Sequence, residues 1–154
     1  MARKPDTTTR MLQAGILAWI CPGAGHFFLG HRGLAAVFFI AISFAYGTGL
    51  AVGGAMNSVN PRANHWLFLA EIGVGGYTTA GYAVSSYLQA NWPDDINLMS
   101  FYPESDVAQI YLAVGGLLNL LAILDALARA QTGGMPVFYH ELLREGDIPG
   151  GDER

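Results

Sequence analysis

Charge is what this sequence has least of. Only 13% of its 154 residues are charged, whereas a soluble domain of this size carries about 25%. The net charge of −4 offers no basic face of the kind that nucleic-acid recognition needs. The two shortages exclude an ordinary soluble domain and a nucleic-acid partner.

Cysteine is nearly absent too, because Cys21 is the only one, so no internal disulfide can form. A lipoprotein acylation site at Cys21 would need a small residue before it, and Ile20 is large. A cleaved signal peptide is an open alternative, since basic residues among the first ten positions precede a weak small-residue site at Gly23-Ala24-Gly25. We favour an uncleaved first helix.

Catalytic and metal-binding patterns are missing as well. The sequence has no apparent Ser-His-Asp set, no H-E-x-x-H and no phosphate-binding loop. His26 and His31 are five residues apart rather than four, and neither has a Cys or a carboxylate pair near it. We therefore predict a non-enzymatic protein with no metal and no other cofactor.

A long uncharged run is the main feature that the sequence does have. The 23 residues from Leu34 to Met56 include no Asp, Glu, Lys or Arg, and roughly 20 helical residues cross a bilayer core. Lipid requires the backbone to satisfy its own hydrogen bonds, which favours helices. Val37 to Ala45 lacks the alternation typical of a membrane barrel. The run predicts an integral membrane protein in a lipid bilayer.

Four apolar segments predict an all-α fold, an integral membrane four-helix bundle whose first two helices form a tight hairpin. Pro22 falls inside the first segment and predicts a kink there. Residues 1–134 form the transmembrane domain, and residues 135–154 form a short cytoplasmic tail. The expected helices are Thr9–Leu29, Leu34–Met56, His65–Ala90 and Val107–Gln131.

Basic residues orient this multi-pass bundle, because cytoplasmic loops carry an excess of Lys and Arg. With four spans, one side holds only Arg32 as a basic residue, together with four loop acids. We therefore expect the other side, with both termini, to be cytoplasmic. That side holds Arg3, Lys4, Arg10, Arg62, Arg129, Arg144 and Arg154, and the acids opposite are Asp94, Asp95, Glu104 and Asp106.

Small residues predict how the helices associate, because they let membrane helices approach closely. Gly49 and Gly53 form a GxxxG pattern in the second helix, and Gly115-Gly116 lies in the fourth. The third helix carries several more, from Gly73 to Ser85. One interpretation is internal packing of the bundle, and the other is a groove for a partner or a second copy. Spacing does not separate the two.

Polar residues inside a span are functional candidates by default. Glu71 lies roughly 6–9 Å into the third helix by helix rise, and Asp125 lies near the cytoplasmic end of the fourth. Both are thus expected at one interface, either as headgroup-level carboxylates paired with Arg129 or Arg62, or as a shared proton or cation site. Asp125 and Arg129 have the favourable i,i+4 order. Asn119, deeper in the fourth helix, is expected to bond a neighbouring helix.

His26 is expected to bond a backbone carbonyl freed near Pro22, or to cap the turn. An unbroken first helix would place it roughly 20 Å or more from the two acids by helix rise. That separation makes an intramembrane enzyme that pairs His26 with a carboxylate the least favoured interpretation.

Two segments resemble known families. The stretch from Pro22 to Gly30, PGAGHFFLG, resembles the two-transmembrane hairpin domains, in which small residues, a His and an aromatic pair precede Leu-Gly at the turn. The motif residues are Pro22, Gly23, Gly25, His26, Gly30 and Gly33. The segment GLLNLLAILDALARAQTG, with Asn119 and Asp125, is similar to the closing helix of a bacterial family of uncharacterised small multi-pass proteins. The resemblance implies a protein of the bacterial inner membrane.

The features together favour an accessory or scaffold subunit that packs against other membrane proteins or against a second copy. The alternative is a small transporter or ion-conducting protein that uses Glu71 and Asp125, with Asn119. Flux measurements on Glu71 and Asp125 variants, and recovery of partners under mild extraction, discriminate between these hypotheses.

Overall fold

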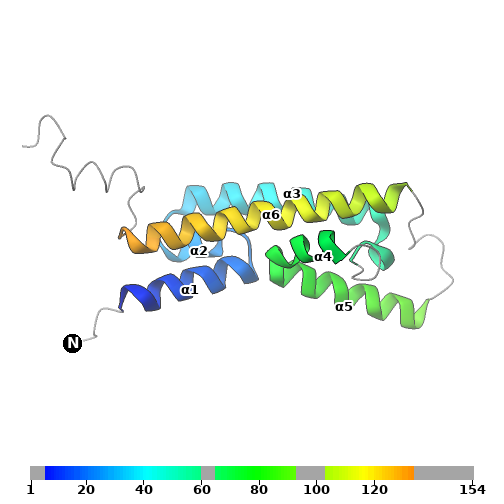
Figure 1. Cartoon of the computed structure of the whole chain (residues 1–154), viewed down its shortest axis with the longest axis horizontal. Helices are drawn as coiled ribbons and strands as arrows, with labels where there is room; N and C mark the ends of the chain where they lie inside the picture. The colour runs from blue at the N-terminus through cyan, green and yellow to red at the C-terminus, as the bar shows by residue number, and fades with distance from the viewer. Residues whose placement is uncertain (1–5, 60–64, 93–102, 134–154) are drawn as a thin grey trace, which may run out of the picture.

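The computed structural model describes residues 6–59, 65–92 and 103–133, and every regular element within these ranges is helical. Figure 1 shows an elongated bundle of long and short helices. The all-α prediction is confirmed for the described residues. The elements are α1 (Thr7–Ile20), α2 (Ala24–Phe28), α3 (Arg32–Asn57), α4 (His65–Glu71), the 3-10 helix η1 (Ile72–Val74), α5 (Gly75–Asn91) and α6 (Glu104–Gln131).

The first predicted helix is in fact two helices that fold back on each other, here called the first hairpin (α1 and α2). Pro22 supplies no backbone donor, and Gly23 has a left-handed φ of 78°, a conformation that glycine adopts without steric cost. A Cβ on Gly25 would meet the carbonyl of Ala14, so α2 lies directly against α1. The predicted continuous helix Thr9–Leu29 is therefore wrong: the chain reverses at Pro22 instead of kinking.

This reversal changes which end of the bundle α3 starts from. Figure 1 shows α1 and α3 both beginning at the end where α6 finishes. Arg32 therefore lies at the same end as Arg10 and Arg129, and its predicted placement on the opposite side is wrong. The helical run predicted from Leu34 to Met56 is present in α3, with non-helical backbone angles at Gly54.

The third predicted helix is also interrupted. Helix α4, of 7 residues, runs inward, η1 turns the chain, and the longer α5, of 17 residues, runs back past the level where α4 began (Figure 1); these three elements are the second hairpin. Val74, with φ −105° and ψ 67°, leaves the helical region at the turn. The predicted continuous helix His65–Ala90 is wrong.

Helix α6 confirms the fourth prediction and extends it by one turn at its start. It ends at Gln131, followed by Gly133 with φ 71°. Helices α3 and α6 run antiparallel along the bundle, and each is long and apolar enough to cross a membrane. The bundle thus combines two full-length helices with two half-length hairpins in place of the four predicted spans. The predicted tail, 135–154, lies outside the described residues, as do Arg3, Lys4, Arg62, Asp94, Asp95, Arg144 and Arg154.

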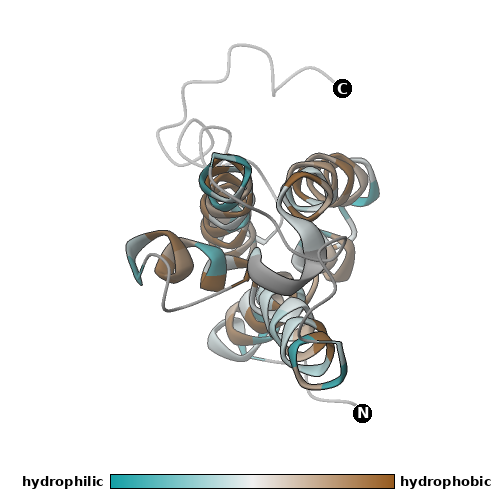
Figure 2. Cartoon of the chain, turned by 90° about the vertical axis from the view of Figure 1, so that its right-hand side faces the viewer, coloured by the Kyte–Doolittle hydropathy of each residue, from teal (hydrophilic) through white to brown (hydrophobic). Residues whose placement is uncertain are grey.

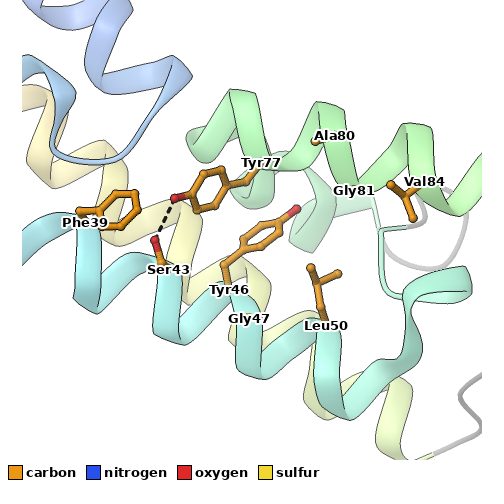
Figure 3. A pocket seen from close by; sticks show the side chains of 9 residues that line it. All are labelled: Phe39, Ser43, Tyr46, Gly47, Leu50, Tyr77, Ala80, Gly81 and Val84. Atoms are coloured by element: carbon orange, nitrogen blue, oxygen red, sulfur yellow. Dashed lines mark hydrogen bonds between the residues drawn. The ribbon is translucent and has the colours of Figure 1, made fainter.

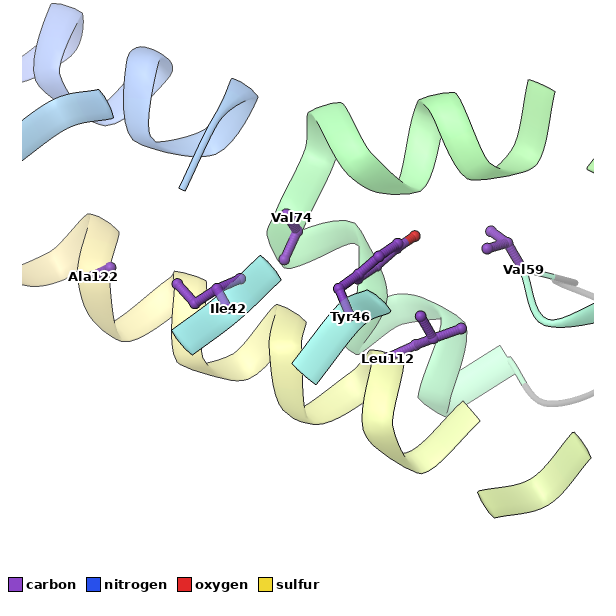
Figure 4. Packing of buried hydrophobic residues seen from close by; sticks show 6 residues of the cluster. All are labelled: Ile42, Tyr46, Val59, Val74, Leu112 and Ala122. Atoms are coloured by element: carbon purple, nitrogen blue, oxygen red, sulfur yellow. The ribbon is translucent and has the colours of Figure 1, made fainter. Parts of the chain in front are cut away.

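The distribution of side chains is the reverse of that in a soluble domain. Alanines and polar residues fill much of the interior, whereas large apolar residues face outward, such as Phe44 at 76% exposed and Trp66 at 81%. Figure 2 shows hydrophobic residues on the helices in view. A small apolar cluster lies between η1 of the second hairpin and the two long helices (Figure 4). Its members are Ile42, Tyr46, Val59, Val74, Leu112 and Ala122.

Candidate functional site

The two hairpins meet end to end in the middle of the bundle. The Trp19 side chain of α1 donates from Nε1 to the carbonyl of Ile72 at 2.9 Å. Gly76 is in such close contact that an added Cβ would meet the carbonyl of Ile20. The carboxyl end of α1 thus faces the amino end of α5, an arrangement in which the two helix dipoles attract each other.

Asn119 on α6 joins both hairpins at this point. Its Nδ2 donates to the carbonyl of Ala18 at 2.9 Å and to the carbonyl of Gly73 at 2.8 Å. The side chain is fully buried, and Oδ1 has no hydrogen-bond partner in the described part of the chain. The prediction that Asn119 bonds a neighbouring helix is confirmed, and it bonds two segments.

Glu71 ends α4 at the same level. Its side chain is 1% exposed, and Oε2 has no hydrogen-bond partner among the described residues. Its backbone carbonyl accepts a 2.5 Å hydrogen bond from the Thr78 hydroxyl, which accepts in turn from the Tyr46 hydroxyl at 3.4 Å. A Cβ on Gly116 would lie 3.0 Å from the Glu71 Cα. Glu71 is therefore deep in the bundle, and its predicted position at the Asp125 interface is wrong.

Asp125 lies in a second polar cluster, nearer the end of the bundle where α1 begins and α6 finishes. Oδ2 of Asp125 accepts from Arg129 Nε at 2.6 Å and is 2.8 Å from His26 Nε2. The i,i+4 pair with Arg129 is confirmed. The expected separation of roughly 20 Å between His26 and the acids by helix rise is wrong for Asp125, because the reversal at Pro22 brings α2 against α6. The expected carbonyl bond or turn cap for His26 is replaced by this pair.

The two acids do not form one site. Glu71 lies level with Gly116 of α6, and Asp125 follows nine residues later, about 13 Å along the helix. His26, at 0% exposed, lies with Asp125, and its ring is 4.7 Å from that of Phe38. The shared proton or cation site of Glu71 and Asp125, given above as one of two alternatives, is not formed. In the described part of the chain, no three His, Cys, Asp or Glu side chains gather as a metal site would require.

The remaining motif residues build the hairpin and not a polar site. Pro22 is buried, and a Cβ on Gly23 would meet the carbonyl of Ala35. Gly30, with φ 91°, lies in the turn before α3, and Gly33 has open space around it. Sequence reasoning missed Trp19 and η1. The Gly-x-Gly pattern at residues 23–25, repeated at 73–75, is a signal from which the two breaks could have been found.

A groove of about 500 Å³ lies between α3 and α5 (Figure 3). Its lining is mostly apolar, and Ser43 and Tyr77 share a 2.8 Å hydrogen bond across it. Tyr46 lines the groove and also contacts Thr78, the hydroxyl bonded to the Glu71 carbonyl. The groove therefore borders the buried polar centre from the side.

In the part of the chain that the structure describes, these features define an all-helical fold with two helices able to cross a membrane and two interrupted hairpins that meet at its centre. The chain belongs to a family of unknown function, DUF6677, whose profile matches residues 13–135. No curated protein and no solved structure matches the chain. The match confirms the expected membership of an uncharacterised family, and the family brings no activity with it.

Proposed function

We propose that this protein is a non-enzymatic integral membrane transporter that moves protons through Glu71. Membrane residence is supported by the two long apolar helices and by the outward-facing large apolar side chains. A surface of this kind is stable in lipid and costly in water. The family match is neutral on this point.

The observation that carries the proposal is the meeting of two interrupted hairpins at a buried carboxyl group. Transporters with inverted repeats place their sites near the bilayer midplane, where discontinuous helices from the two halves meet. Here α1–α2 enters from one end and α4–η1–α5 from the other, and each is followed by a full-length helix (Figure 1). Glu71 and Asn119 lie where the tips meet.

A proton is the substrate that suits this centre best. An unpaired carboxylate in an apolar interior is expensive, so Glu71 is stabilised there when it binds a proton. Divalent cations such as Ca²⁺ need six or more oxygen ligands, and the described residues bring only one carboxylate to this point. The contacts at Trp19 and Asn119 close the centre, so the proposed cycle separates the tips and exposes Glu71 to one side at a time.

Part of the small-residue pattern that motivated the accessory-subunit hypothesis packs within this chain. Gly49 and Gly53 contact Leu112 and Ala108 of α6, and Gly116 contacts Ala70. The small residues are thus used within this chain, as the internal-packing interpretation expects. Co-purification with a larger complex under mild extraction remains its test.

The transport proposal is tested by proton flux in liposomes that contain the purified protein. A potassium diffusion potential with valinomycin drives the flux, and an internal pH dye reports it. We expect wild type to acidify the liposomes at least about tenfold faster than Glu71→Gln, the loss typical of removing a proton-transfer group. Glu71→Asp should retain part of the flux.

Asp106→Asn is the matched control, because it removes an exposed acid of the same helix bundle; its flux should equal that of wild type. Equal flux in wild type and Glu71→Gln would overturn the role of Glu71. Wild-type flux no faster than that of empty liposomes would overturn the transport proposal as a whole.

A further inference from the structure

A second groove, of about 390 Å³, lies between the first hairpin and α3. Its walls are apolar, and Cys21, Phe27, Ala36 and Phe39 are among its lining residues. Arg32 is the one charged residue that lines it. From Arg32 to Phe39 the groove follows α3 for about 10 Å by helix rise, from the end of the span toward its middle.

Arg32 is placed to receive an anion at the mouth of this groove. Its guanidinium lies 5.9 Å from the Phe27 ring centroid, a cation–π arrangement that leaves its hydrogen-bond donors available. Within the described residues, both ion pairs involve Asp125, and Arg32 takes part in neither. Arg32 is also the first residue of α3, where the helix dipole adds partial positive charge.

We propose that this groove binds one anionic phospholipid, with an acyl chain along α3 and the phosphate group at Arg32. An apolar trough with a single cation at its outer end matches a molecule with an apolar chain and a negative headgroup. Arginine is well suited to phosphate because its planar donors bind two oxygens at once. The inference depends on membrane residence and not on proton transport, so it stands if the flux experiment fails.

Cys21 reports occupancy directly, because it lines the groove and is the only cysteine in the sequence. The full-length protein is placed in nanodiscs of phosphatidylcholine, with or without phosphatidylglycerol, and Cys21 is labelled with N-ethylmaleimide. We expect phosphatidylglycerol to slow labelling by about fivefold, the preference that one arginine gives for an anionic lipid surface. Arg32→Gln should abolish the slowing.

Arg10→Gln is the matched control, because Arg10 lies at the same end of the bundle but does not line the groove; the slowing should persist. Ala36→Trp fills the groove and should slow labelling in both lipids. Equal labelling rates of wild type in the two lipids, or slowing that persists in Arg32→Gln, would overturn the proposal.

Native mass spectrometry gives a readout independent of thiol reactivity. Wild type and Arg10→Gln should retain one more phosphatidylglycerol than Arg32→Gln after release from the nanodisc. Equal lipid retention by the three proteins would contradict the assignment of the headgroup to Arg32.

Discussion

The two hairpins reach the same point of the bundle by different means. The first reverses through Pro22 and the left-handed Gly23, whereas the second turns through η1 with no positive φ. The first holds its buried ionisable side chain, His26, against Asp125. The second ends its inward helix with Glu71, whose Oε2 is unpartnered in the described part of the chain.

This difference separates anchoring from chemistry. The buried His26 ring is paired through Nε2 with the partly exposed Asp125 carboxylate, which fixes the first hairpin against α6, while its Nδ1 has no partner among the described residues. A buried carboxyl oxygen without a partner costs stability, and natural proteins retain such groups in membranes mainly where they function. We therefore place the proton-binding site on the second hairpin. The first hairpin is the fixed element against which the second hairpin moves.

The largest expected effect comes from filling the close contacts at both hairpin tips. Gly25→Val would press on the carbonyl of Ala14, and Gly76→Val would press on the carbonyl of Ile20. We expect each to lower the free energy of unfolding in detergent by about 3 kcal/mol or more, read from denaturation followed by circular dichroism. Gly33→Val, with open space around it, should change little. If Gly76→Val were as stable as Gly33→Val, the result would contradict the end-to-end contact between α1 and α5.

A double-mutant cycle on His26→Ala and Asp125→Ala tests the anchor of the first hairpin. Hydrogen bonds to charged groups contribute about 1.5–3 kcal/mol, so we expect a coupling energy of that order in the free energy of unfolding. Arg129→Ala measures the other partner of Asp125 separately. A coupling energy of zero would contradict the contact between His26 and Asp125 and would favour the separation that an unbroken first helix implies.

Replacing Glu71 by Gln should have the smallest effect on stability, although it removes the proposed transport. Gln keeps the shape of the side chain and is never ionised, so it replaces one neutral polar group with another and removes the cost of burying the ionised carboxylate. We expect the free energy of unfolding to stay the same or to rise by about 1 kcal/mol. Asp125→Asn, which weakens a paired group, should instead lower it. A large loss of stability in Glu71→Gln would make Glu71 a structural residue and remove the contrast between the hairpins.

Predictions that depended on local spacing were correct, and those that depended on direction were not. The helical content of α3 and α6 follows from their long apolar runs, and the Asp125–Arg129 pair follows from i,i+4 geometry. Pro22 and Gly23 marked a break, but whether a chain kinks or reverses depends on the surface that receives the next segment. Here that surface includes Ala126, against which Gly25 lies. An error at one break displaced every depth calculated from it, including those of His26 and Arg32.

The docking of the first hairpin on α6 has a consequence for biosynthesis. Asn119 bonds the carbonyl of Ala18, 101 positions earlier in the chain. Helix α1, with 14 residues, is shorter than the roughly 20 that cross a bilayer, so the translocon has no complete span to release when this segment emerges. Helix α1 therefore waits for α6 before it takes its place. A nascent chain cut short before α6 would leave the hairpin undocked and recognisable to membrane proteases.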